Sequence, residues 1–157
     1  MTGVQTCALP IYAYRALYQC TDAELLAHAS CWMATAPGCG NTAYNITNGD
    51  LIRWENLWPA FARAFGMEPG PQRHMRLASF MADKAPVWEA MVRKYGLAPH
   101  RYADIVSWPY GDFVFATGYD VISDTGKARR AGFHECVDTG ARFLEIFDTY
   151  RRERIIP

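Results

Sequence analysis

The chain has 157 residues, half of them hydrophobic and a fifth charged, which is enough for one domain with a buried core. Its 16 basic and 16 acidic residues balance, so charge gives no indication of binding to nucleic acid or to an anionic membrane. No apolar run approaches the ~18 residues that a membrane-spanning helix requires.

Cysteine and histidine spacing argues against disulfides and zinc. The number of cysteines is odd, no two form a Cys-x-x-Cys pair, and residues 1–11 lack the basic start of a signal peptide. We therefore expect free thiols in a cytoplasmic protein. The four histidines are scattered without ligand spacing, so we expect no metal site.

Residues 1–11 resemble the in-frame translation of a common sequencing-library adaptor read from a GTG start. This resemblance implies that they are a scar outside the fold and that the natural coding sequence is interrupted there. We therefore expect residues 1–11 to pack poorly, without both Leu9 and Ile11 being deeply buried.

The first predicted helix follows residues 21–24, which match a capping box with Thr21 as the cap and Glu24 as its partner. Pro37-Gly38 ends this helix. Its inward face is predicted to contain Leu25, Ala29, Trp32, Met33 and Ala36. A catalytic role for Asp22 or His28 is the alternative to a helix cap and a solvated flank.

Residues 45–58 are the stretch around which the chain is organised. Residues 42–47 suit the end of a buried strand, and Asn48-Gly49 is a turn signal. A helix follows from Trp54 to a stop at Gly66, with Pro59 making it start late or kink. Its apolar face is Trp54, Leu57, Trp58, Phe61 and Phe65, at helical spacing.

The later elements are mostly short helices. We predict a loop over 67–75, a helical turn over 77–81, a helix from Pro86 to Gly96 and a loop over 97–103. A short extended piece follows over 120–123, then a basic helix closed by Gly132. The last helix runs from about Asp138 to Arg154.

Residues 108–115 are the densest aromatic segment, and they also contain a proline and a glycine. At helical spacing Tyr110 and Phe113 share a face, whereas Phe115 lies about 200° from Phe113. Some of these rings should therefore point away from the main core. They would form either an apolar wall against a substrate or satellite core packing.

Motifs for cofactor binding and catalysis are missing from the sequence. It contains no Gly-x-Gly-x-x-Gly, no phosphate-binding Gly-x-x-x-x-Gly-Lys-Ser/Thr and no Gly-x-Ser-x-Gly. It also contains no Tyr-x-x-x-Lys pair. We therefore assign no catalytic, cofactor-binding or metal-binding residue.

Six short pieces of the chain share their order with a known family. They are Thr21-Asp22-Ala23; Asn45-x-x-Asn48-Gly49-Asp50 with Trp54 and Leu57-Trp58; Lys84-Ala-Pro-Val-Trp88; Tyr95-Gly96-Leu97; Lys127-Ala-Arg-Arg-Ala-Gly-Phe133; and Ile155-Ile156-Pro157. Together they resemble the C-terminal half of atypical short-chain dehydrogenases/reductases of the progesterone 5β-reductase and iridoid synthase type.

The resemblance implies an α/β protein: residues 12–157 would be the mostly helical, substrate-side part of a Rossmann-type extended fold with a few short strands. Such enzymes bind NADP(H) or NAD(H) in an N-terminal domain and transfer hydride to an enone. Their glycine-rich loop and Tyr/Lys pair lie before every matched piece, so the chain alone should bind no cofactor and be inactive. Plant members have a different turn at residues 124–127, which leaves the substrate open.

In such a parent enzyme, Trp108, Tyr110 and Phe113 are the expected substrate-binding residues, and the partner is a small apolar substrate. Two alternatives remain. One is part of an extended enzyme of the epimerase or dehydratase type, for which basic residues should converge on a pyrophosphate. The other is a self-sufficient module that binds a small apolar ligand without nucleotide.

Overall fold

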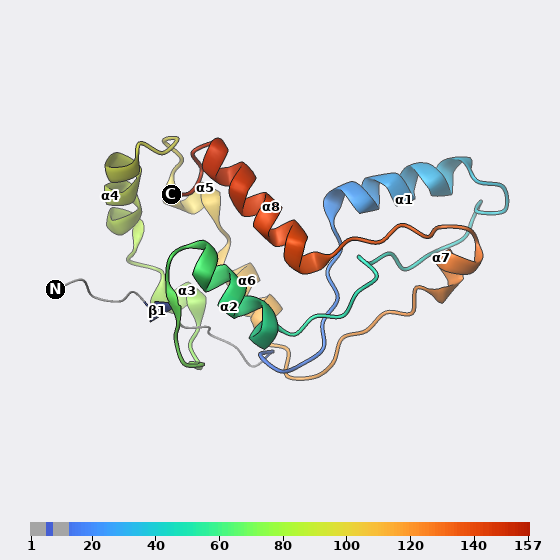
Figure 1. Ribbon diagram of the computed structural model, residues 1–157, viewed down its shortest axis with the longest axis horizontal. Helices are drawn as coiled ribbons and strands as arrows, with labels where there is room; N and C mark the ends of the chain where they lie inside the picture. Colours follow the sequence, from blue (N-terminus) through green and yellow to red (C-terminus); the bar gives the residue numbers. More distant parts are fainter. Residues whose placement is uncertain (1–5, 8–12) are drawn as a thin grey trace.

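The computed structural model describes residues 6–7 and 13–157, and it is mostly helical (Figure 1). The elements, in chain order, are β1 (Thr6–Cys7), α1 (Ala23–Thr35), α2 (Trp54–Ala64), β2 (Glu68–Pro69), α3 (Leu77–Phe80), α4 (Ala85–Tyr95), α5 (Tyr102–Ile105), α6 (Trp108–Phe115), α7 (Gly126–Arg130) and α8 (Thr139–Arg152). The expectation for Leu9 and Ile11 falls outside the described residues.

Strand structure is minimal in the described part of the chain. β1 and β2 pair in parallel with Thr6 opposite Glu68, and one isolated antiparallel bridge joins Tyr18 to Ile52. The strand predicted for residues 42–47 is wrong, because no ladder forms there. No backbone N–H of residues 42–47 donates a hydrogen bond to a described residue. The segment therefore has the composition of a strand but lacks a neighbouring strand.

The main core is built on α2, as the spacing of its apolar residues predicts. Trp54 and Phe61 are buried, and the Phe61 ring packs 5.1 Å from Phe143 and 5.2 Å from Phe147 of α8. The helix begins at Trp54 and continues through Pro59, so a late start is wrong. The aromatic faces of α2 and α8 thus meet in one cluster.

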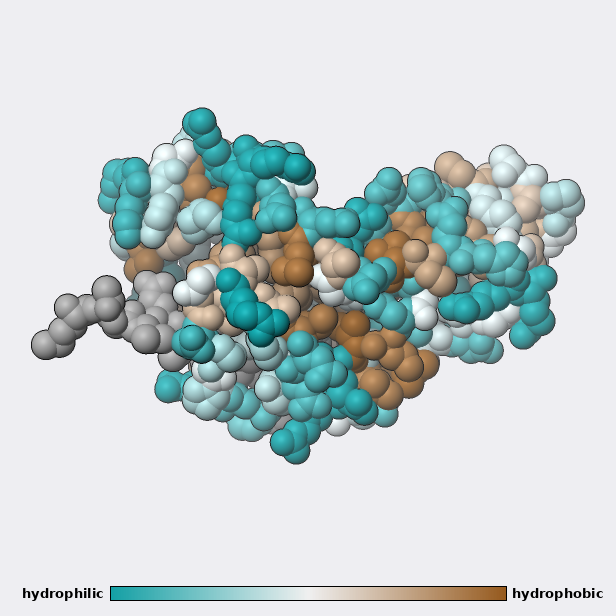
Figure 2. All heavy atoms as spheres, viewed as in Figure 1, coloured by the Kyte–Doolittle hydropathy of each residue, from teal (hydrophilic) through white to brown (hydrophobic). Residues whose placement is uncertain are grey.

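A second, smaller cluster lies under α1 and α7. It contains the buried residues Leu25 and Ala29 of α1, Ala128 of α7, and Phe133. In Figure 1 these two helices form the right-hand part of the molecule, apart from α2 to α6. Figure 2 shows a notch between the two parts in the upper outline, with hydrophobic surface below it.

The remaining helices follow the predictions, but the predicted loop over 67–75 is wrong at its start, because it contains β2. α4 ends at Gly96 in the left-handed conformation (φ 61°), as predicted, and α8 begins after the cap Asp138. The loop predicted over 97–103 is wrong at its end, because α5 begins at Tyr102. Residues 120–123 form no regular element and lie beside residues 17–19, with Val121 N–H donating to the Leu17 carbonyl (2.9 Å).

Candidate functional site

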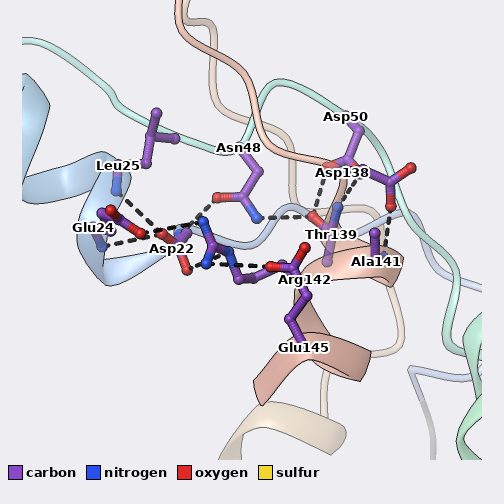
Figure 3. Close-up of polar contacts among 10 residues, drawn as sticks. All are labelled: Asp22, Glu24, Leu25, Asn48, Asp50, Asp138, Thr139, Ala141, Arg142 and Glu145. Carbon is purple, nitrogen blue, oxygen red and sulfur yellow. Dashed lines mark hydrogen bonds and ion pairs between the residues drawn. The ribbon is translucent and has the colours of Figure 1, made fainter. Parts of the chain in front are cut away.

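A polar junction of Asp22, Asn48, Asp50, Thr139 and Arg142 joins the two parts of the molecule (Figure 3). Asn48 is only 2% exposed and satisfies both ends of its amide. Its Oδ1 accepts from the Asp22 backbone N–H (2.6 Å), and its Nδ2 donates to Thr139 Oγ1 (2.9 Å). A buried amide held in this way fixes the position of the turn between the starts of α1 and α8.

Asp50 completes the connection to α8. Its carboxylate accepts from the Thr139 backbone N–H (2.9 Å) and from Thr139 Oγ1 (2.7 Å). The Thr139 hydroxyl therefore donates to Asp50 and accepts from Asn48. These two bonds use the hydroxyl's single donor and one of its two acceptor positions. The turn at residues 48–50 is tied to the first turn of α8 by these bonds.

The cap of α1 differs from the prediction. Asp22, not Thr21, caps the helix, because its Oδ1 accepts from the N–H groups of Glu24 (3.0 Å) and Leu25 (3.1 Å). The Thr21 hydroxyl instead donates to the Ile46 carbonyl (3.0 Å). Asp22 is thus held in a structural role, which disfavours the catalytic alternative.

Arg142 is surrounded by acidic groups. Its guanidinium nitrogens lie 3.3 Å from carboxylate oxygens of Asp22, Glu24 and Glu145. The Nε atom lacks hydrogen-bond geometry toward any described group, so its contact with Asp22 is an ion pair only. Three carboxylates around one cation leave a net negative charge, which is unsuited to a phosphate or pyrophosphate.

A cavity of about 180 Å³ opens beside the junction, with Cys20, Phe143 and Ile146 in its wall. Burial, and to a lesser extent Asp50, raises the pKa of Cys20 to about 11. The thiol is therefore protonated near neutral pH and is no thiolate nucleophile. Burial, then Cys20 and Tyr110, also raise the pKa of Tyr18.

His28 lies on the surface rather than in a site. Its Nδ1 is 2.9 Å from Glu135 Oε2, and both side chains are about half exposed. The hydrogen bond to Glu135 raises the pKa of His28, with further contributions from Glu135, Glu24 and Asp22. This pair connects α1 to the segment after α7.

The structure separates the three predicted substrate-binding residues into two places on α6. Tyr110 and Phe113 are 66% and 73% exposed, and their rings lie 6.3 Å apart on one face, as the spacing predicts. Trp108 is half-buried, and its ring centre lies 6.1 Å from that of Tyr102. Both rings line a cavity of about 510 Å³ that is separate from the cavity beside the polar junction. Phe115 packs against the main core.

Carboxylates already occupy the N-termini of α1, α3, α7 and α8, whereas α2, α4, α5 and α6 have no side-chain cap. Asp22 caps α1, Asp138 caps α8 through the Ala141 N–H (2.8 Å), and Asp124 accepts from Gly126 N–H (2.7 Å) at α7. Asp112 accepts from both Leu77 and Ala78 at the start of α3. These four N-termini do not fit the pyrophosphate of a dinucleotide, because a carboxylate already occupies each of them.

Neither a metal-binding group of side chains nor a membrane-spanning helix is found among the described residues. Residues 6–7 and 13–157 contain no group of three His, Cys, Asp or Glu side chains placed to hold a metal ion. None of the described helices is long and apolar enough to cross a bilayer.

Sequence reasoning missed the polar junction. Asn48 reads as a turn residue, and nothing local distinguishes a buried Asn from an exposed one. Thr139 and Arg142 lie about 90 residues from it along the chain. The local signal is limited to two polar residues, Asn48 and Asp50, on either side of Gly49.

Comparison with known proteins relates most of the chain to short-chain dehydrogenase-type enzymes, although no family model matches it. An (S)-8-oxocitronellyl enol synthase from Nepeta racemosa is 32% identical over 142 residues, covering 88% of this chain and 36% of the relative. One from Antirrhinum majus is 30% identical, covering 99% of this chain and 39% of the relative. A short chain dehydrogenase from Penicillium aethiopicum is 31% identical, covering 86% of this chain and 40% of the relative.

These relatives are iridoid synthase-like enzymes and a short-chain dehydrogenase, as the ordered sequence pieces indicated. The chain spans 36% to 40% of their length. What it shares with them is therefore a partial, oxidoreductase-like piece.

Proposed function

We propose that the chain is the substrate-side part of an NAD(P)H-dependent short-chain dehydrogenase/reductase that acts on an enone, and that it is inactive alone. The dinucleotide-binding part and the catalytic Tyr/Lys pair would belong to another part of the parent protein. Two features support that division: the sequence contains no Gly-x-Gly-x-x-Gly motif, and carboxylates occupy the N-termini of α1, α3, α7 and α8.

The observation that carries the proposal is the exposed ring pair on α6. Tyr110 and Phe113 present two large, adjacent rings to solvent. Contiguous exposed aromatic surface marks a binding surface more often than isolated exposed rings do. In a complete enzyme the rings would cover an apolar substrate and exclude water from the reacting carbon.

Residues 42–47 support a larger parent sheet. Tyr44 and Ile46 pack against the second cluster, whereas Ala43 and Asn45 are exposed, which is the alternation of a half-buried strand. The N–H groups of this segment donate to no described residue. Unpaired strand edges are normally covered or paired.

An epimerase or dehydratase that binds a sugar nucleotide is less well supported. It would need cations free to meet a pyrophosphate near the substrate. At the polar junction, Arg142 is already paired with three carboxylates.

The test is a fusion of residues 12–157 to the preceding portion of the Nepeta racemosa relative, assayed for NADPH-dependent reduction of enones. We expect the fusion to be active. Tyr110→Ala and Phe113→Ala should each raise KM about ten- to a hundredfold or change substrate preference, since a covered ring contributes about 1.5–3 kcal/mol.

Tyr95→Ala is the matched control, because Tyr95 is also exposed (51%) but lies on α4. It should leave KM unchanged. Equal effects of the α6 and α4 substitutions would contradict a substrate role for α6.

A further inference from the structure

Asn48 of the polar junction is followed by glycine, the sequence in which asparagine deamidates most readily. In this reaction the backbone nitrogen of the next residue attacks the side-chain Cγ, and ammonia leaves as a five-membered succinimide forms. Water then opens the succinimide to aspartate or isoaspartate. Glycine hinders the attack least, because it has no Cβ. Of the four asparagines in the sequence, Asn48 is the one that precedes a glycine.

The folded chain holds both reacting groups in other contacts (Figure 3). Asn48 is 2% exposed, its Oδ1 accepts from the Asp22 N–H (2.6 Å), and its Nδ2 donates to Thr139 Oγ1 (2.9 Å). The Gly49 N–H donates to Thr47 Oγ1 (3.3 Å). Deamidation removes Nδ2 and draws Cγ onto the Gly49 nitrogen, so these bonds must open before it can proceed.

The product of deamidation does not fit the junction. The Thr139 hydroxyl has a single proton, which it donates to Asp50 (2.7 Å). A carboxylate at position 48 has no proton to donate to Thr139 in place of the lost amide. Two carboxylates would then face one hydroxyl in a buried place, which is unfavourable without a compensating cation. Isoaspartate would in addition lengthen the backbone of the turn.

We propose that Asn48 is a deamidation site that the polar junction keeps closed, and that its conversion after the junction opens prevents the junction from forming again. Conversion would therefore weaken the connection between the starts of α1 and α8 irreversibly. The site does not depend on the proposed function, since water is the one reactant besides the chain itself.

The experiment follows Asn48 in the full chain by peptide mass spectrometry that distinguishes asparagine, aspartate and isoaspartate. In mildly alkaline buffer the folded chain should convert at least about thirtyfold more slowly than the chain in urea, because two buried hydrogen bonds must open first. Thr139→Val keeps the shape of the side chain and removes its hydroxyl. It should speed conversion in the folded chain about fivefold or more.

Three control variants assign the effect. Thr139→Ser keeps the hydroxyl, and Thr149→Val makes the same change as Thr139→Val elsewhere on α8, where the hydroxyl accepts from Arg152 at an exposed position. Both should convert within about twofold of the unaltered chain, with circular dichroism showing that each is folded. In urea, Gly49→Ala should convert more slowly, because its methyl group hinders attack by the backbone nitrogen.

The effect of conversion on the junction is measured with Asn48→Asp, which reproduces one of the two products. Its urea midpoint at neutral pH should be lower than that of the unaltered chain. Asn45→Asp changes an exposed side chain of the same segment and should leave the midpoint nearly unchanged.

Equal rates of conversion in the folded chain and in urea would overturn the proposal, and this comparison stands even where Thr139→Val does not fold. An unchanged rate in folded Thr139→Val would overturn protection by the junction. Equally fast conversion of Gly49→Ala in urea would overturn attack by the Gly49 nitrogen. An unaltered urea midpoint in Asn48→Asp would overturn the claim that the product keeps the junction open.

Discussion

At the scale of single residues, Asn48 is the side chain on which the polar junction depends. Asn48→Ala would leave the Asp22 N–H and the Thr139 hydroxyl without their amide partner in a buried place. We expect the free energy of unfolding in urea to fall by about 2–3 kcal/mol. Asn45→Ala, which removes one exposed hydrogen bond to Asp124, should cost under about 1 kcal/mol. Equal losses of stability in Asn48→Ala and Asn45→Ala would contradict the structural role of Asn48 in the polar junction.

Two phenylalanines distinguish the core from the exposed face of α6. Phe61 is 7% exposed and contacts three aromatic rings, so Phe61→Ala should lower stability by about 3–5 kcal/mol. Phe113 is 73% exposed, so Phe113→Ala should change the free energy of unfolding by no more than about 0.5 kcal/mol. A loss of about 3 kcal/mol in Phe113→Ala would place this ring in a core instead.

The pair of His28 and Glu135 predicts a weak dependence of stability on pH. Because Glu135 raises the pKa of His28 in the folded chain, the stabilisation is complete below the unfolded pKa of about 6.5. It is lost as pH rises through the folded pKa. The urea midpoint of the unaltered chain should exceed that of Glu135→Gln at about pH 5.5 and match it at about pH 8.5. The same difference at both pH values would show that protonation of His28 is not involved.

At the scale of elements, the turn before α2 needs glycine. Gly49 has φ 96°, and a Cβ there would lie 2.8 Å from Cys136 Sγ. Gly49→Ala should therefore lower the free energy of unfolding by more than about 1 kcal/mol. Gly40→Ala, with nothing within 4 Å of the added Cβ and no positive φ, is the control and should be near neutral. Removing the thiol as well, in Gly49→Ala/Cys136→Ala, should restore only part of the loss, because the backbone strain remains.

The helices could be predicted from sequence because their signals are local. The apolar spacing of α2, the proline and glycine that bracket α4, and the cap of α8 all lie within a few residues of what they determine. The strand predicted for residues 42–47 does not form, since a strand needs a neighbouring strand, which local composition does not reveal. For the same reason the hydrogen bond between Asn48 and Thr139 could not be predicted, because 91 residues separate them in the sequence. The shared face of Tyr110 and Phe113 was predicted, because it depends on local helical spacing.

At the scale of the whole molecule, two hydrophobic clusters are held together by the polar junction. α2 and α8 build the main core, and α1 and α7 build the second cluster. The chain covers little more than a third of its relatives. Within this frame the rings of α6 are exposed, and the N–H groups of residues 42–47 donate to no described residue.

The most direct test of this account is calorimetric titration of the 157-residue chain with NADPH. We expect no binding in the micromolar range, because the sequence contains no Gly-x-Gly-x-x-Gly motif and carboxylates occupy the N-termini of α1, α3, α7 and α8. A dissociation constant of about 1–10 μM, corresponding to about 7–8 kcal/mol, would contradict it by showing that the chain carries its own dinucleotide site.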